Sequence, residues 1–282
     1  MQIAIASGKG GTGKTTVATN LAYLAGRSGQ TTTYIDCDVE EPNGHIFLKP
    51  RIVEERPVWK AVPQVNEYLC TGCGRCGEVC QYSAIVSIGR KVLVYPELCH
   101  ACGGCAMFCP TGAITEASRQ IGSLRIGESG SVRFVDGLLN VGEAMSPPVI
   151  RAVRQAAPPA DLAIVDAPPG TGCPVIASIR GCDYVVLVTE PTPFGLHDLR
   201  LAVALVRELG LPFGVLLNRA GIGDDSVTAW CHAEGIHLVA EIPDDRGIAE
   251  AYSRGRMACE VVPYVGDALR ALLDNVQEAF AV

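Results

Sequence analysis

Apolar and polar positions alternate with a clear rhythm at the start of the chain. Residues 2–6 form a short apolar run typical of a buried strand, and from Lys14 to about Arg27 apolar side chains recur at helical spacing. A second strand is predicted at Thr31 to Ile35, where β-branched and aromatic residues precede Asp36-Cys37-Asp38. This order predicts a strand, a loop, a helix and a second, parallel strand, joined by a right-handed crossover.

The same rhythm returns after about residue 140. The pattern predicts four more strands, at 162–165, 184–189, 213–218 and 237–241. It predicts helices between and after them, at roughly 147–157, 174–181, 196–209, 225–234, 246–254 and 266–280. Strands that alternate with helices predict an α/β fold, with an open, mostly parallel sheet covered by helices on both faces.

The middle of the chain has a different character. From about residue 58 to 116 it is rich in Cys and Gly, with only a short strand pair, around Ala84–Ile88 and Lys91–Tyr95. Short strands or a hairpin are expected at Ser123–Ile126 and Val132–Val135. We therefore predict a small α+β domain, residues 58–117, inserted into an α/β domain formed by residues 1–57 and 118–282.

Composition narrows the classes of function. The 282 residues carry a formal net charge of −7, which argues against a nucleic-acid binder that relies on a broad basic field. No stretch approaches the length of uninterrupted apolar residues that a membrane span needs, so we expect no membrane insertion. The first residues lack the pattern of a signal peptide, so we expect a cytoplasmic, reducing setting, where clustered thiols bind metal more often than they form disulfides.

A phosphate-binding loop follows the first strand. Gly8 to Thr15 fits the pattern G-x-x-x-x-G-K-T, between a predicted strand and a predicted helix. Backbone N–H groups of such a loop surround phosphate, Lys14 reaches the β- and γ-phosphates, and the Thr15 hydroxyl can ligate Mg²⁺. The predicted nucleotide contacts in this segment are Gly8, Lys9, Gly10, Gly11, Thr12, Gly13, Lys14, Thr15 and Thr16.

The loop contains a second lysine, Lys9, within the run Lys-Gly-Gly-Thr-Gly-Lys-Thr. This run resembles the deviant Walker A loop of the MinD/ParA family of P-loop ATPases. The resemblance covers roughly residues 1–50 and 140–282, and it implies an ATPase that uses ATP and Mg²⁺. It also implies an ATP-dependent homodimer, in which Lys9 crosses to the phosphates held by the partner subunit.

Two further segments match the family. Asp36 and Asp38 end the second strand, where the family places the aspartate that orients or deprotonates the attacking water; Asp38 is the better candidate by position, with Asp36 supporting it or the metal. The run from Asp166 to Gly170 resembles Walker B with switch II. The resemblance implies that Asp166 holds Mg²⁺ through water, together with Thr15 and Asp38, and that the Gly170 N–H senses the γ-phosphate.

Residues at two later strand ends resemble the adenine-contacting segments of this family. They are Asn218, Pro243 and Asp245. Ordinary polar residues at strand ends are the alternative interpretation, and the sequence leaves it open.

Eight of the 13 cysteines lie in two matched runs. The runs resemble a bacterial two-cluster ferredoxin, which implies two 4Fe–4S clusters, the fourth cysteine of each run serving the other cluster. Zinc is the alternative, since four thiolates do not by themselves choose a metal. The resemblance implies one ligand set of Cys70, Cys73, Cys76 and Cys109, and a second of Cys99, Cys102, Cys105 and Cys80.

The five other cysteines divide into two groups. Cys182, Cys231 and Cys259 are predicted to be small core residues. Cys37, between the switch aspartates, and Cys173, after switch II, are either sensors of the nucleotide state, ligands of a cluster between subunits, or structural residues. The sequence does not choose among these roles.

Together the motifs predict an ATP-hydrolysing iron–sulfur protein. Our first hypothesis is that a nucleotide-dependent dimer cycle drives electron transfer to a partner metalloprotein, or the maturation of that partner. Lys9, Lys14, Asp38 and Asp166 are the predicted catalytic residues. The alternative is an iron–sulfur cluster carrier or regulatory scaffold whose ATP binding only sets the oligomeric state.

Overall fold

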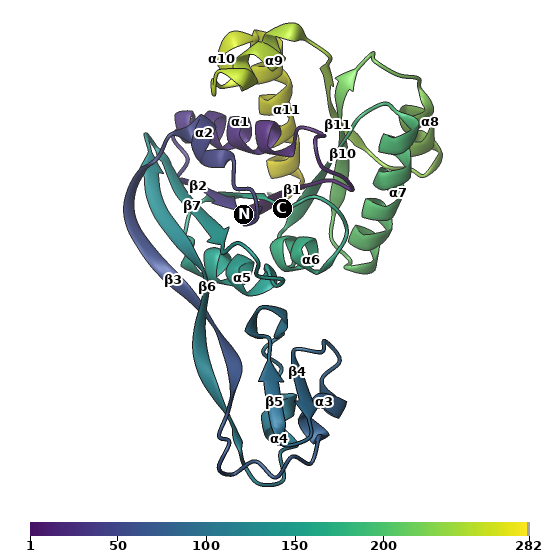
Figure 1. Cartoon of the computed structure of the whole chain (residues 1–282). Coiled ribbons are helices and arrows are strands. Elements are labelled where there is room, and N and C mark those ends of the chain that lie inside the picture. The colour runs from purple at the N-terminus through teal and green to yellow at the C-terminus, as the bar shows by residue number, and fades with distance from the viewer. Residues whose placement is uncertain (281–282) are drawn as a thin grey trace.

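One large sheet forms the centre of the protein (Figure 1). The computed structural model describes residues 1–280, and within them the sheet has nine strands in the order β11-β10-β9-β1-β8-β2-β7-β6-β3. The strands are β1 (Gln2–Ala6), β2 (Thr32–Asp36), β3 (Arg51–Val65), β6 (Ile114–Ser129), β7 (Val132–Leu139), β8 (Leu162–Asp166), β9 (Tyr184–Thr189), β10 (Phe213–Ala220) and β11 (Leu238–Pro243).

The pairing of these strands confirms the prediction of a mostly parallel sheet. From β11 to β7 each neighbouring pair is parallel, whereas β6 and β3 at one edge are antiparallel. The β1 strand lies near the middle and pairs with β8 and β9. In the sheet β8 lies between β1 and β2, so the first crossover connects two parallel strands and spans one intervening strand.

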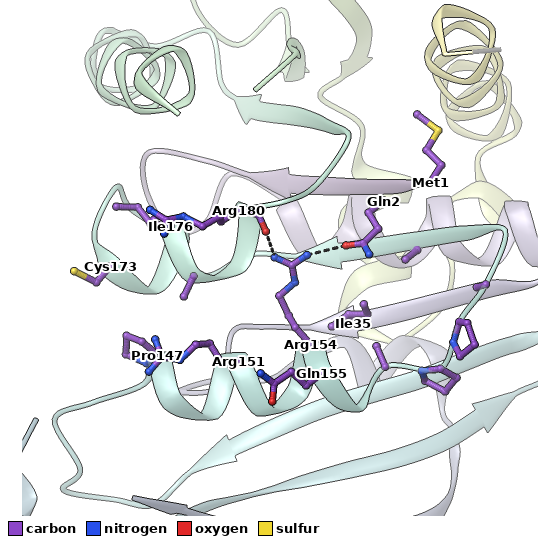
Figure 2. A pocket seen from close by; sticks show the side chains of 16 residues that line it. Met1, Gln2, Ile35, Pro147, Arg151, Arg154, Gln155, Cys173, Ile176 and Arg180 are labelled. Carbon is purple, nitrogen blue, oxygen red and sulfur yellow. Dashed lines mark hydrogen bonds between the residues drawn. The ribbon is translucent and has the colours of Figure 1, made fainter. Parts of the chain in front are cut away.

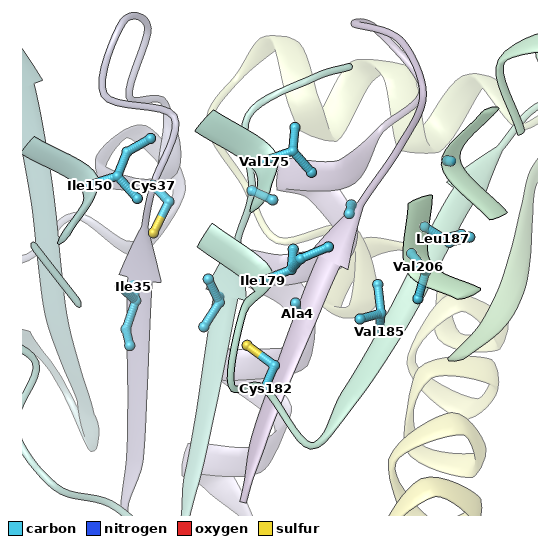
Figure 3. Close-up of a cluster of buried hydrophobic side chains, with 14 of the residues drawn as sticks. Ala4, Ile35, Cys37, Ile150, Val175, Ile179, Cys182, Val185, Leu187 and Val206 are labelled. Carbon is cyan, nitrogen blue, oxygen red and sulfur yellow. The ribbon is translucent and has the colours of Figure 1, made fainter. Parts of the chain in front are cut away.

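Helices cover both faces of the sheet, as predicted. Side chains alternate along β1: Ile3 and Ile5 face one buried apolar cluster, and Ala4 and Ala6 face the other. Figure 3 shows part of the second cluster, with Ala4 among its members. The first cluster is covered by α1 (Lys14–Arg27), α9 (Arg246–Ser253), α10 (Ala258–Val261) and α11 (Pro263–Ala279). The second is covered by α5 (Pro147–Ala156), α6 (Cys173–Ile179), α7 (Pro193–Glu208) and α8 (Ser226–Ala233).

The predicted helices are found within about three residues of their expected ends. The largest differences, of three residues, are at the starts of α7 and α11, which begin at Pro193 rather than 196 and at Pro263 rather than 266. At α7 the Thr192 side chain accepts a hydrogen bond from the Gly195 N–H and caps the helix there. Two short helices outside the Cys-rich segment, α2 (Gly44–Leu48) and α10, were not predicted, and neither were the short helices within it.

A long antiparallel ribbon differs most from the prediction. The β3 strand was not predicted at all, and the expected short strand at 123–126 is part of β6, which has 16 residues. The pairing of β3 with β6 runs from Arg51 opposite Glu128 to Val65 opposite Ile114, well beyond the contact of β6 with β7. Both predicted domain boundaries, near 58 and 117, fall inside these two strands.

The ribbon carries a small lobe at its far end (Figure 1). The lobe, residues 66–113, has a two-stranded sheet of its own, close to the predicted strand pair, and its own small clusters of buried side chains. Its elements are α3 (Arg75–Val79), β4 (Ile85–Ile88), β5 (Lys91–Val94), the 3₁₀ helix η1 (Pro96–Leu98) and α4 (Gly104–Met107). We call the rest of the chain, without lobe and ribbon, the body.

No helix among residues 1–280 combines the length and apolar character needed to cross a bilayer.

Candidate nucleotide site and cysteine cavities

The carboxyl ends of the central strands bring the predicted nucleotide-site residues together. In the sheet, Asp36 at the end of β2 lies opposite Asp166 at the end of β8, and Ile5 of β1 lies opposite Asp166 on its other side. The phosphate-binding loop leaves the sheet one residue after β1, at the same edge. Parallel strands thus place the loop and the acidic residues side by side.

The backbone of the loop depends on glycine at two positions. Gly11 and Gly13 have φ angles of +79° and +94°, which L side chains rarely adopt. A Cβ atom on Gly13 would lie 2.3 Å from Nδ2 of Asn218, whose amide donates a 2.8 Å hydrogen bond to the Thr12 carbonyl. Asn218 therefore lies against the phosphate-binding loop and fixes its shape.

Lys14 lies among the aspartates. Its side chain is buried, and burial lowers its pKa while the charges of Asp166 and Asp38 oppose that change. The same surroundings raise the pKa of Asp38 to about 6, through burial first and the Asp166 charge second. Burial also raises the pKa of Asp166 to about 6, against the nearby Thr15 and Tyr34 hydroxyls and the Lys14 charge.

Two buried oxygens at this site lack a hydrogen-bond partner within the described chain: Oδ1 of Asp166 and Oγ1 of Thr12. The other oxygen of Asp166 accepts a 2.9 Å hydrogen bond from Tyr34. A buried oxygen without a partner is costly unless a ligand satisfies it. The free carboxylate oxygen, close to Thr15 and Lys14, fits the predicted Mg²⁺ and phosphate site.

Asp36 has a structural task in this arrangement. One of its carboxylate oxygens accepts a 3.1 Å hydrogen bond from the Asp38 N–H, and the other accepts a 2.9 Å bond from the Gly44 N–H. Burial and the Asp166 charge raise its pKa well above the ordinary value. Asp36 thereby holds the turn that presents Asp38, in line with the supporting role expected for it.

Three other predicted contacts are engaged within the chain. The Gly170 N–H donates a 3.1 Å hydrogen bond to the Ser7 carbonyl, so a contact with γ-phosphate requires that bond to open. Asp245 is the N-cap of α9: one oxygen accepts from the Gly247 N–H and the other from the Tyr264 hydroxyl at 2.9 Å. Pro243 ends β11 opposite Ala220. Asp245 and Pro243 are thus placed as strand-end and capping residues.

Lys9 has a partner that the sequence analysis missed. Its ammonium lies 3.4 Å from one carboxylate oxygen of Glu190, and Arg219 donates a 2.8 Å hydrogen bond to the other. Glu190 comes directly after β9 and is largely buried. The lysine that is predicted to cross to a partner subunit is held by its own chain in this structure.

The eight clustered cysteines line two separate cavities in the lobe. Cys70, Cys73, Cys76 and Cys109 line one, which we call the outer cavity. Cys80, Cys99, Cys102 and Cys105 line the other, the inner cavity. Each cavity gathers three cysteines of one run and the last cysteine of the other. Among residues 1–280, no three His, Cys, Asp or Glu side chains are arranged to ligate a single metal ion.

The inner cavity is the one closer to the body. Ribbon residues Ala61, Pro63 and Glu116 line it, whereas the outer cavity is lined by the very end of the ribbon at Val65 and Ile114. Two aromatic rings of the inner cavity, Tyr82 and His100, stack with centroids 3.3 Å apart.

The remaining cysteines differ in burial. Cys37, Cys182 and Cys231 are buried in one apolar cluster, and burial raises their pKa values. Cys259 is half-buried, and burial raises its pKa to about 11. Cys173 is exposed at the start of α6. The positions of Cys182 and Cys231 confirm their prediction as core residues, and Cys37 packs as they do.

A wide groove lies elsewhere in the described part of the chain. It has a volume of about 850 Å³ and lies between α5 and α6, with Cys173 at one end and Arg154 reaching across to Gln2 and the Arg180 carbonyl (Figure 2). Of the residues considered for the nucleotide or the clusters, Cys173 alone lines it. The phosphate-binding loop, the switch aspartates and the eight clustered cysteines all lie outside this groove.

Comparison with known proteins agrees with this geometry. The family described as the CobQ/CobB/MinD/ParA nucleotide-binding domain matches residues 3–258. The chain belongs to this family. Its fold is also that of solved members: the septum site-determining protein MinD from Pyrococcus horikoshii, complexed with Mg-ADP, superimposes with a TM-score of 0.62 at 20% identity, over 99% of this chain and 97% of that one.

Relatives of similar length also exist. Two uncharacterized proteins of Methanocaldococcus jannaschii are each 30% identical to the present chain. The first match covers 90% of this chain and 90% of the relative, and the second covers 99% of this chain and 97% of the relative. A protein of Pyrococcus horikoshii named iron-sulfur cluster carrier protein is 23% identical over 90% of this chain and 77% of its own. The chain therefore has the nucleotide-binding ATPase fold of its family.

Proposed function

We propose that this protein is a Mg²⁺-dependent ATPase that closes as a homodimer around ATP and carries two 4Fe–4S clusters in its lobe. In this proposal the ATPase cycle drives electron transfer to a partner metalloprotein, or the maturation of that partner. The cytoplasm is the expected setting, and we expect neither nucleic acid nor membrane insertion to take part.

The nucleotide half of the proposal assigns roles to the residues at the strand ends. Loop N–H groups and Lys14 bind the phosphates, while Thr15 and Asp166 hold Mg²⁺, which would neutralise phosphate charge when bound. Asp38, with its pKa near 6, is ionised at neutral pH and accepts a proton from the attacking water. Lys9 leaves Glu190 and reaches the phosphates of the partner subunit.

The cysteine half is supported by one observation above the others. The last cysteine of each run crosses to the cavity lined by the other run, so Cys109 faces Cys70, Cys73 and Cys76, and Cys80 joins the second set. Two-cluster ferredoxins share their cysteines in this way. When bound, the clusters would supply reversible one-electron chemistry. The chain's own contribution is to hold four thiols around each cavity.

Iron content tests the cluster assignment. The full chain purified without oxygen should contain about eight iron and eight sulfide ions, as two cubanes require. Cys76→Ser and Cys105→Ser, one in each cavity, should each remove about half of the iron, whereas Cys231→Ser, in the body, should remove none. Zinc without iron in the purified protein would overturn the cluster half of the proposal and leave the ATPase half standing.

Nucleotide turnover tests the other half. Lys14→Ala should abolish ATP hydrolysis, because no other buried ammonium neutralises the phosphates, and Lys9→Ala should abolish ATP-dependent dimerisation while nucleotide still binds. Lys49→Ala is a suitable control, since Lys49 lies just after α2, outside the loop. Undiminished turnover in the Lys14 variant would show that the loop has been misassigned.

A cluster carrier is the second candidate. The name of the Pyrococcus horikoshii relative favours it, as does the exposure of Cys73 and Cys102, one thiol in each cavity. Incubation with two acceptors separates the two functions: a carrier loses iron to an acceptor that lacks its cluster, whereas an electron donor keeps its iron and becomes oxidised only by an acceptor that already holds an oxidised metal centre. ATP should be required for electron transfer, which the ATPase cycle is proposed to drive, and not for cluster transfer by a carrier.

A further inference from the structure

A buried ion pair joins the ribbon to the body. The ammonium of Lys60, on β3, lies 2.7 Å from one carboxylate oxygen of Glu143, and both side chains are only 2% exposed. The second oxygen of Glu143 accepts a 2.8 Å hydrogen bond from Nε of Arg119, on β6. Charged groups are rarely so deeply buried, and removal of one partner leaves an uncompensated charge in a medium of low polarity.

One end of this pair lies beside the segment that carries Cys99, although Lys60 does not itself line the inner cavity. Lys60 donates a 3.3 Å hydrogen bond to the carbonyl of Glu97, two residues before Cys99. Along the strand, Lys60 and Val62 are on the same face, and Val62 packs against Cys99 and Cys80.

The other end of the pair, Glu143, is connected to the switch II segment through the packed helices α5 and α6. Glu143 lies in the segment between β7 and α5, where its N–H donates to the Asn140 carbonyl. The α5 helix packs on α6, and α6 begins at Cys173, three residues after Gly170. A change at Gly170 on nucleotide binding therefore has a short, packed route to Glu143.

The two charges act on the inner cavity with opposite sign and unequal strength. Lys60 contacts the segment that carries Cys99 directly, whereas Glu143 contacts it only through its two partners, Lys60 and Arg119, the second of which lies 3.6 Å from a carboxylate oxygen of Glu97. Reduction adds negative charge to an iron–sulfur centre, so a nearby ammonium favours the reduced form and raises the potential. Neither charge lines a cavity, but the contact of Lys60 with Glu97 lies beside the inner one, whereas no residue of the outer cavity is a partner of this pair.

We propose that the Lys60–Glu143 pair is the element through which the body sets the reduction potential of the inner cysteine centre. The proposal rests on the clusters of the proposed function and adds a regulation to them. A nucleotide-dependent shift of α5 moves Glu143 relative to Lys60, and the inner centre then gains or loses part of the positive charge that favours its reduction. The outer centre keeps its own potential.

Potentiometric titration of the full-length, iron-loaded protein, followed by electron paramagnetic resonance, tests this. Lys60→Met should lower one of the two midpoint potentials, because it removes the ammonium beside the Cys99 segment, and Glu143→Gln should raise the same one, because it removes the carboxylate that offsets this ammonium. The double variant should return close to the wild-type value, and Lys60→Arg, which keeps the charge, should not move it. Arg56→Met is the matched control: Arg56 pairs with Glu54 on the same strand but is exposed, so neither potential should change.

Several results would overturn the proposal. If both single variants shift the inner midpoint potential in the same direction, the pair only supports the fold. The same conclusion follows if either variant shifts both midpoint potentials together. No shift in either variant would mean that the charges do not reach the centre. If wild-type protein binds no iron, the proposed function fails before this test begins, so the two failures are distinguishable.

The nucleotide arm uses a non-hydrolysable ATP analogue. In the wild type the analogue should shift the inner potential and leave the outer one unchanged. In the double variant, which lacks both charges, the shift should be lost while the analogue still binds. A shift of the same size in the double variant would contradict the assignment of the link to Lys60 and Glu143.

Discussion

Substitution of Gly13 by alanine tests the geometry of the nucleotide site most directly. The φ angle of +94° costs an alanine about 1–2 kcal/mol. The new Cβ would lie 2.3 Å from Nδ2 of Asn218, and the Asn218 side chain can move away only by breaking its hydrogen bond to Thr12, which is worth about 1 kcal/mol. The wild-type loop conformation therefore becomes less stable by about 2–3 kcal/mol.

The empty loop of the variant is free to relax, so nucleotide binding must restore the strained conformation. We expect the affinity for ADP to fall roughly 30- to 150-fold. Titration with a fluorescent ADP analogue measures this, and thermal unfolding of the same sample shows that the variant is folded.

Gly29→Ala is the control for backbone strain alone. Gly29 has a similar φ of +91° in the turn after α1, but nothing lies within 4 Å of the position that a Cβ atom would take there. This variant should lose stability and keep its affinity for ADP. If Gly13→Ala binds ADP within about threefold of the wild type, the loop does not depend on this backbone conformation and the reasoning is refuted.

Three other perturbations give separate tests. Glu190→Gln should free Lys9 and make ATP-dependent dimers about fivefold tighter, as an ion pair worth about 1 kcal/mol is lost; unchanged association in sedimentation experiments would contradict this. The pKa of Asp38 is raised to about 6 in the folded protein, so its charge weakens the fold as pH rises through that value. Asp38→Asn should therefore abolish hydrolysis yet raise the melting temperature at about pH 7.5, and the gain should vanish near pH 4; a gain that persists at low pH would refute the electrostatic cause. Finally, a short Asn-Gly turn from Val65 to Ile114 in place of the lobe should leave ADP affinity unchanged, because these residues are already paired and the body has its own core. Loss of ADP binding would show that the body needs the lobe to fold.

The sequence was most informative where a feature is local. The phosphate-binding loop, the aspartates at the ends of β2 and β8, and the spacing of the cysteine runs are all short patterns. In the structure Asp36 lies opposite Asp166, and four cysteines line each of two cavities, while the roles assigned to these residues stay predictions. The parallel sheet could be predicted because its strands are also short local patterns. Each is an apolar run buried on both faces, and these runs alternate along the chain with helical segments.

Features that join distant parts of the chain could not be predicted. Lys60 and Glu143 are 83 positions apart, and Glu190 approaches Lys9 only because β9 and β1 are neighbours in the sheet. No periodicity or motif connects such residues. The β3 strand escaped recognition for another reason: its first seven residues are exposed, so its side chains show no alternation between buried and exposed faces there.

The same β3 strand has a consequence for how molecules meet one another. It is the last strand of the sheet and pairs only with β6, so one side of its backbone is open along its length. Such an edge is a template for a strand of another molecule, and association of that kind ends in aggregation. Pro57 and Pro63 supply no N–H for pairing, and the charged run from Glu54 to Arg56 opposes close approach. The ribbon that carries the lobe therefore has an outer strand whose prolines and charges oppose edge-to-edge aggregation.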